Sequence, residues 1–233
     1  MKRADLAFGA LLLATAVALG YVLFFVFLVA PEAQLAAGGL AQKIFYFHVP
    51  AAYAMYLSGT VCLVASAAYL IAPTDRRDAW AKAAAETAVL FGLMVLTSGP
   101  LWAKKAWGIY WTWEPRLTTS LLSVVVYAAI VVVRAFAGDG SAERKFAAAF
   151  GILGTVNLPF IHVAVQKWGG NHPMVIRGSG GGISPEMRHG LLFGFLAMTL
   201  LTAVVLWSRS RLALSVSRSR RLAEAAMSAG IEE

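Results

Sequence analysis

The feature that most constrains this chain is a series of long apolar stretches separated by short polar breaks. An α-helix needs roughly 20 residues to cross the hydrocarbon core of a bilayer, and each stretch has about that length. The stretches fall at about residues 7–30, 49–72, 84–103, 117–137, 146–166 and 189–207. They predict an all-α integral membrane protein, built as a bundle of six transmembrane helices.

The composition excludes a water-soluble fold. Only 14% of the residues are charged, against about 25% in soluble domains, and the mean hydropathy is +0.69. The first apolar stretch is about twice as long as the core of a signal peptide, so we expect a helix that is retained. Membrane lipid is therefore the expected surrounding of most of the chain.

The net charge of +8 raises nucleic-acid binding as an alternative. The basic residues, however, sit in short clusters between apolar stretches, which is typical of membrane topology. We therefore expect no nucleic-acid partner. Cys62 is the only cysteine, which excludes an intrachain disulfide and the paired-cysteine signatures of zinc sites and covalent haem attachment.

The distribution of Lys and Arg predicts how the helices are oriented. Counted on alternate sides of the six stretches, thirteen of the 20 basic residues share the side of both termini and seven lie opposite. Cytoplasmic segments carry the excess of Lys and Arg, so we expect both termini in the cytoplasm and the connections near 31–48, 104–116 and 167–188 outside. We divide the chain into a six-helix domain, residues 1–208, and a basic cytoplasmic tail, residues 209–233.

The second outward connection is dense in aromatic side chains and reads Trp107-Gly-Ile-Tyr110-Trp111-Thr-Trp113-Glu114-Pro115-Arg116. One interpretation is an interfacial belt, since Trp and Tyr favour the headgroup level of a bilayer. The other is a flat shelf for a planar apolar ligand, against which aromatic rings pack. Arg116 would then pair with a ligand carboxylate in a bidentate fork. Spacing alone leaves both interpretations open.

The chain has four histidines, which are His48, His162, His172 and His189. Haem iron binds one or two neutral imidazoles, one from each face of the ring. His48 and His172 fall in the first and third outward connections, on the side of the aromatic run, and are the candidate iron ligands. His162, inside the fifth stretch, is the alternate ligand or else a helix-packing residue. His189 opens the sixth stretch and is expected to be interfacial.

These motifs resemble those of the WWD-domain haem-handling family of cytochrome c assembly. The stretch WGIYWTWEPRLT, within about 104–120, is similar to the tryptophan-rich signature of that family. Two further stretches, KIFYFHVPAA and NLPFIHVAVQKWGGNHP, are similar to its histidine motifs. This sequence departs from the family pattern at Glu114, where Asp is usual, at Lys43, where Arg is common, and at Lys167, which replaces a Trp.

The resemblance implies a set of haem-binding residues. His48 and His172 match the axial ligands of the iron, and Lys43 and Arg116 match basic residues near the haem propionates. The remaining residues expected to contact haem are Trp107, Trp111, Trp113, Glu114 and Trp168.

The number of spans and the chain length resemble the CcmC branch of this family. That resemblance implies a bacterial inner-membrane protein, not an enzyme, which binds haem b as cargo at its periplasmic face and presents it for c-type cytochrome biogenesis. The implied partners are the haem chaperone CcmE, the small subunit CcmD and the ABC transporter CcmA/CcmB. The chain has no phosphate-binding GxxxxGK[ST] motif, so we expect any use of ATP to belong to partners.

Two other function classes remain open. One is an enzyme, a haem lyase that forms thioether bonds on an apocytochrome. The other is a secondary transporter, which usually carries broken helices or charges at mid-bilayer depth and internal repeats. Asn157, Pro159 and His162 are the residues that hint at a transporter.

Overall fold

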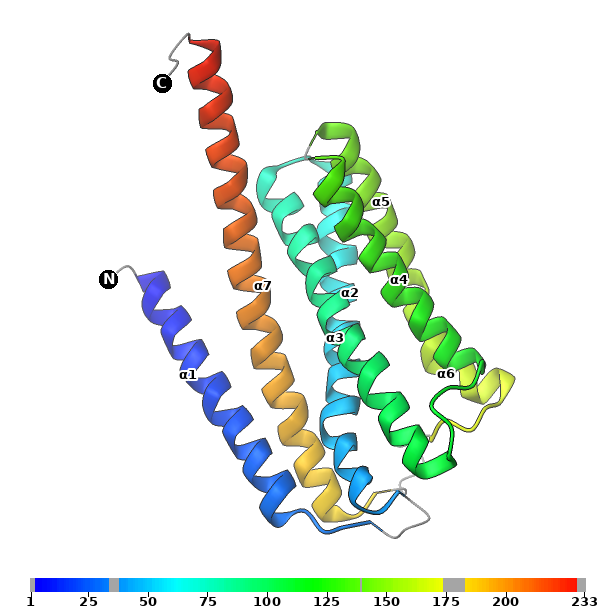
Figure 1. The fold of residues 1–233 in the computed structure, drawn as a ribbon. Coiled ribbons are helices and arrows are strands. Elements are labelled where there is room, and N and C mark those ends of the chain that lie inside the picture. Colours follow the sequence, from blue (N-terminus) through cyan, green and yellow to red (C-terminus); the bar gives the residue numbers. More distant parts are fainter. Residues whose placement is uncertain (1–2, 34–37, 139, 174–182, 230–233) are drawn as a thin grey trace.

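The computed structural model describes residues 3–33, 38–138, 140–173 and 183–229, and the regular structure of these residues is helical (Figure 1). The elements are α1 (Arg3–Phe24), the π-helical turn η1 (Phe25–Val29), the 3-10 helix η3 (Gly39–Ile44), α2 (Phe45–Ile71), α3 (Asp75–Trp107), α4 (Pro115–Phe136), α5 (Ser141–Val156), α6 (Leu158–Trp168) and α7 (Pro185–Ser228). Six spans within the described residues are long and apolar enough to cross a membrane. The prediction of an all-α, six-span membrane protein is confirmed.

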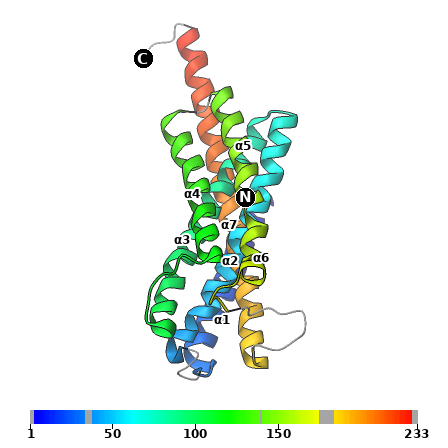
Figure 2. The same ribbon diagram turned by 90° about the vertical axis from the view of Figure 1, so that its right-hand side faces the viewer.

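The helices run side by side along one long axis (Figures 1 and 2). Helix α2 packs most extensively on α3 and also contacts α5 and α7, while α1 packs on the outer side of α7. Buried alanines, which are Ala83, Ala84, Ala85 and Ala88, let the α3 backbone approach its neighbours closely, as small residues do between membrane helices. The start of α2, the α3–α4 connection and the start of α7 share the lower end of the bundle in Figure 1.

The expected fifth span differs from the prediction, because it is broken into α5 and α6 at Asn157. Pro159 lies in the first turn of α6 and lacks the N–H that would continue the helical bonds of α5. The Asn157 side chain donates to the Thr119 carbonyl and to Ser123 Oγ on α4, both at 2.7 Å. Polar contacts with α4 thus hold the broken span in place.

The second span begins earlier than expected. Helix α2 starts at Phe45, directly after η3, so His48 belongs to its first turn. Pro50 is in the second turn, inside the helix. The missing proline N–H leaves the Tyr46 carbonyl without its usual helical partner. Because α2 begins at Phe45, a helix carries His48 and not the loop before it.

Helix α7 continues without a break through residue 208 to Ser228. Its extension forms ion pairs with other helices, from Arg209 to Glu86 at 2.6 Å and from Arg221 to Asp75. The division into a domain and a tail at residue 208 stays a prediction. The glycine-rich segment 178–182 and Arg177 lie outside the described residues.

Candidate functional site

The α3–α4 connection is built by residues with restricted backbone geometry. Helix α3 ends at Gly108, whose φ of 79° reverses the chain and whose N–H reaches the Lys104 carbonyl, as glycine commonly does at helix ends. Helix α4 begins with Pro115 at its first position, where a missing N–H costs nothing. Trp111 and the residues around it therefore form a short loop between two helix ends.

A cavity of about 490 Å³ lies beneath this loop. Ligand sites are typically about 300–1,000 Å³ with mostly apolar walls and a few polar groups. One face of α2 contributes His48, Ala52, Met55 and Tyr56, and one face of α3 contributes Gly99, Ala103 and Trp107. Trp111, Arg116, Ile161, His172 and Met187 complete it from the loop, α4, α6, the α6–α7 connection and α7.

The ring of His48 is fixed by α3. Its Nδ1 lies 2.9 Å from Ser98 Oγ, and the Ser98 hydroxyl donates its own hydrogen to the Met94 carbonyl. Ser98 can therefore only accept from His48, which places the proton on Nδ1 and leaves the Nε2 lone pair available. A Cβ at Gly99 would lie 3.0 Å from His48 Cε1, so the glycine makes room for the ring.

His172 has the same tautomer for a different reason. Its Nδ1 lies 3.0 Å from the Pro173 carbonyl oxygen, and a carbonyl can only accept, so Nδ1 carries the proton. Burial, and after it the positive charge of Arg116, lower the pKa of His172 to about 4. The imidazole is therefore neutral at neutral pH, with Nε2 able to act as a ligand.

The two imidazole rings line the same cavity, at a centre-to-centre distance of 6.4 Å and an interplanar angle of 33°. A metal–imidazole bond is about 2 Å long and a ring nitrogen lies about 1 Å from the ring centre, so two rings on opposite sides of one metal ion are about 6 Å apart. Within the described residues no group of three or more His, Cys, Asp and Glu could hold a bare metal ion. Two imidazoles at this spacing suit a metal that brings its own equatorial donors, as iron in a porphyrin does.

Arg116 supplies the charge of the site. It is the one charged side chain among the described residues that line the cavity, and none of the ion pairs in the described part of the chain involves it. Trp111 adds a buried indole Nε1 without a hydrogen-bond partner in the same part of the chain. The guanidinium of Arg116 and the unpaired indole N–H of Trp111 belong to residues that line the same cavity. Both groups could donate hydrogen bonds to a ligand with carboxylate groups.

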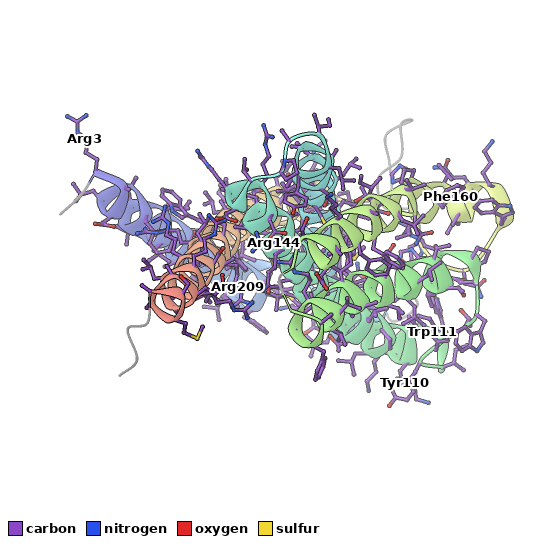
Figure 3. The ribbon with its side chains drawn as sticks, turned by 90° about the horizontal axis from the view of Figure 1, so that it is seen from above. Arg3, Tyr110, Trp111, Arg144, Phe160 and Arg209 are labelled. Carbon is purple, nitrogen blue, oxygen red and sulfur yellow. The ribbon has the colours of Figure 1, made fainter. Side chains whose placement is uncertain are left out.

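The tryptophans predicted from the sequence do not share one surface. Trp107 and Trp111 line the cavity, and Trp111 lies with Tyr110 at the edge of the molecule far from Arg3 (Figure 3). Trp113 is 76% exposed and meets Trp111 edge-on at 5.8 Å. Trp168 is 57% exposed and stacks on Phe160 outside the cavity.

Two predicted contacts also lie outside the cavity wall. Glu114 points to the neighbouring loop, where its Oε2 accepts from the Asn171 N–H at 2.7 Å. Lys43 sits in η3, half-buried, beside Gln42. Gln42 lines the cavity and accepts from Trp102 Nε1 at 3.3 Å.

The other two histidines are not brought to the cavity. His162 is exposed on α6, next to the cavity-lining Ile161. His189 Nε2 lies 2.7 Å from Tyr21 Oη, and its ring packs on Phe25 and Phe193. His189 therefore joins α1, η1 and α7.

Sequence reasoning missed Ser98, Trp102 and Tyr56. Tyr56 lies eight residues after His48, on the same face of a helix by the 3.6-residue period. Trp102 contacts Trp107 edge-on at 5.1 Å. Ser98 had no local signal, because its contact with His48 joins two different helices.

Comparison with known proteins identifies the family. The family model described as "Heme exporter protein C" (CcmC) matches residues 1–225. A protein of that name from Bradyrhizobium diazoefficiens is 32% identical over 165 residues, which are 70% of this chain and 63%, less than two thirds, of that protein. The Escherichia coli K12 protein of the same name is 29% identical over 185 residues, 78% of this chain and 74% of its own length.

A plant relative extends the comparison. The "Putative cytochrome c biosynthesis ccmC-like mitochondrial protein" of Marchantia polymorpha is 29% identical over 167 residues, 71% of each chain. The match to the family model covers more than half of the chain described above. This chain therefore belongs to the Heme exporter protein C (CcmC) family.

Proposed function

We propose that this protein binds haem in the cavity between His48 and His172 and presents it at the periplasmic face of the inner membrane for c-type cytochrome biogenesis. The observation that carries the proposal is the pair of imidazoles on one cavity, with ring centres 6.4 Å apart and each with its proton on Nδ1. Haem iron would take Nε2 of each ring as an axial ligand. The names of the relatives, which refer to haem export and cytochrome c biosynthesis, support the same function.

The other residues of the cavity have separate tasks in this proposal. Arg116 pairs with a propionate, and the indole N–H of Trp111 donates to a carboxylate oxygen. Trp107 and Trp111 cover the apolar porphyrin. Lys43 lies at the rim beside Gln42 and attracts the anionic cargo, here haem b, by its charge. Trp113 and Trp168, exposed on the outside, are contacts for partners or lipid rather than for haem.

The proposed setting follows from the position of the site. The cavity lies at the end of the bundle that the Lys and Arg distribution assigns to the periplasm, so bound haem would be close to a periplasmic acceptor such as the chaperone CcmE. Both termini and the extension of α7 are then cytoplasmic. The proposed partner CcmA/CcmB, an ABC transporter, would hydrolyse ATP on the same side. The small subunit CcmD is a further proposed partner in the membrane.

The test is an absorption spectrum of the purified protein loaded with haem in detergent. The wild type should give a low-spin spectrum, whereas His48→Ala and His172→Ala should shift it to high spin or lose haem. Added imidazole should restore the low-spin spectrum, because the small ligand occupies the vacated axial position. His162→Ala and His189→Ala are matched controls and should behave as wild type. Unchanged spectra in both ligand variants would contradict the proposal.

The same preparation separates the alternatives. Haem binding without apocytochrome supports a haem-handling protein over a lyase. Haem uptake into vesicles that contain this chain alone would support a transporter instead. Broken helices like the span interrupted at Asn157 are common in secondary transporters.

A further inference from the structure

The two candidate ligands are held in different ways. His48 sits in the first turn of α2 and is fixed by Ser98 within the bundle. His172 lies four residues past the end of α6, after two glycines with φ of 77° and 139°. Neither backbone conformation suits a residue with a side chain. The position of His172 therefore depends on contacts of its loop and not on a helix.

One side chain holds this loop from outside. Glu114 Oε2 accepts from the N–H of Asn171, directly before His172, at 2.7 Å. A Cβ at Gly170 would lie 2.9 Å from the same oxygen and 3.2 Å from Glu114 Cδ, so the loop passes against the carboxyl group. Glu114 is itself fixed, because it immediately precedes the first residue of α4.

The two carboxylate oxygens of Glu114 differ in their partners. Glu114 Oε1 is buried and has no hydrogen-bond partner in the described residues. Burying a carboxylate with one oxygen unsatisfied is costly, and no ion pair between described residues includes Glu114. The charged hydrogen bond from the Asn171 N–H and the electrostatic attraction of Arg116 are the interactions that stabilise this carboxylate in the described residues.

We propose that Glu114 is a positioning residue that holds His172 in place as the second axial ligand, and that it does not itself contact haem. The inference rests on the proposed function and gives Glu114 a role other than that of a haem contact. It follows that, among the described residues, Glu114 supplies the contact that holds the His172 side of the iron, while the His48 side is built into the helices. His172 is then the ligand that leaves first when haem is passed on.

The experiment compares Glu114→Ala, which removes the acceptor, with Glu114→Gln, which keeps a carbonyl oxygen at the same reach. Loss of a group that orients a metal ligand typically costs about 10- to 100-fold in affinity. Glu114→Ala should therefore weaken haem binding by about 10-fold or more and give a high-spin spectrum that imidazole restores. Glu114→Gln should remain largely low-spin. Gly170→Ala should resemble Glu114→Ala, because its Cβ displaces the loop from the carboxyl group.

A second readout uses the haem-free protein, so it does not depend on the proposed function. Diethyl pyrocarbonate acylates accessible neutral imidazoles, and mass spectrometry reports the rate at each histidine. His172 should react several-fold faster in Glu114→Ala than in Glu114→Gln, with the exposed His162 reacting equally in both. Equal rates at His172, or a low-spin spectrum in Glu114→Ala equal to wild type, would overturn the proposal. If wild type lacks a bis-histidine spectrum while the rates differ, the proposed function fails but the positioning role stands.

Discussion

At the residue scale, the aromatic run divides into residues inside and outside the cavity. Trp111 lines the cavity, whereas Trp113, two positions further on, is 76% exposed. Burial of about 100 Å² of apolar surface is worth about 2–3 kcal/mol, or roughly 30- to 160-fold in affinity. Trp111→Ala should lose haem affinity to that extent, Trp111→Phe much less, and Trp113→Ala little. Haem titration checks this, and equal haem retention in Trp111→Ala and Trp111→Phe would favour an interfacial belt.

Ser98 allows a test of how His48 is oriented. Its hydroxyl accepts from His48 Nδ1 and thereby selects the tautomer that leaves the Nε2 lone pair available. Ser98→Ala removes the acceptor and should lower haem affinity by about 10-fold or more, while Ser98→Thr keeps an oxygen and should lose less. Haem titration measures both. Identical affinities for alanine, threonine and serine would show that the hydrogen bond does not orient the ring.

The environment of His172 sets the pH dependence of ligation. Burial, reinforced by Arg116, lowers its pKa from 6.5 to about 4, and only the neutral imidazole binds iron. The low-spin spectrum should therefore persist as the pH falls from 7 to 5 and disappear only near pH 4. His172 becomes protonated near pH 6.5 in the unfolded chain and near pH 4 in the folded chain. As the pH falls from 6.5 to 4, this difference lowers the free energy of unfolding. A spectral midpoint near pH 6.5 would contradict the assignment.

At the element scale, the break between α5 and α6 sets where α6 begins, and α6 leads to the loop that carries His172. Asn157 donates two hydrogen bonds to α4, to Thr119 O and Ser123 Oγ. Asn157→Ala leaves these acceptors unpaired and should destabilise the protein by about 1–3 kcal/mol. Because α6 leads to His172, the low-spin fraction should also fall. Thermal unfolding in detergent, with Gln166→Ala on the exposed face as control, provides the comparison.

At the scale of the whole molecule, the bundle has two chemically different ends. One carries the cavity, and the other carries an ion-pair cluster in which Arg134 binds Asp78 through two hydrogen bonds of 2.7 and 2.9 Å. If the excess of Lys and Arg marks the cytoplasm, the cavity end is periplasmic. An impermeant thiol reagent added to whole cells should label Ile109→Cys and spare Ser141→Cys, in a Cys62→Ala background. The reverse pattern would place the cavity on the cytoplasmic side.

The sequence by itself determined the six helical spans and the end of the bundle at which His48, the aromatic run and His172 gather. Both depend on local properties, because apolar length fixes a span and alternation of spans fixes the side of each connection. Only the tertiary structure decided which tryptophans line the cavity, which nitrogen of each histidine carries the proton, and that Glu114 reaches the His172 loop. These depend on contacts between helices far apart in sequence, such as Ser98 with His48. The position of the Asn157 side chain at the break also depends on tertiary structure, because a carbonyl and a hydroxyl group of α4 accept its hydrogen bonds.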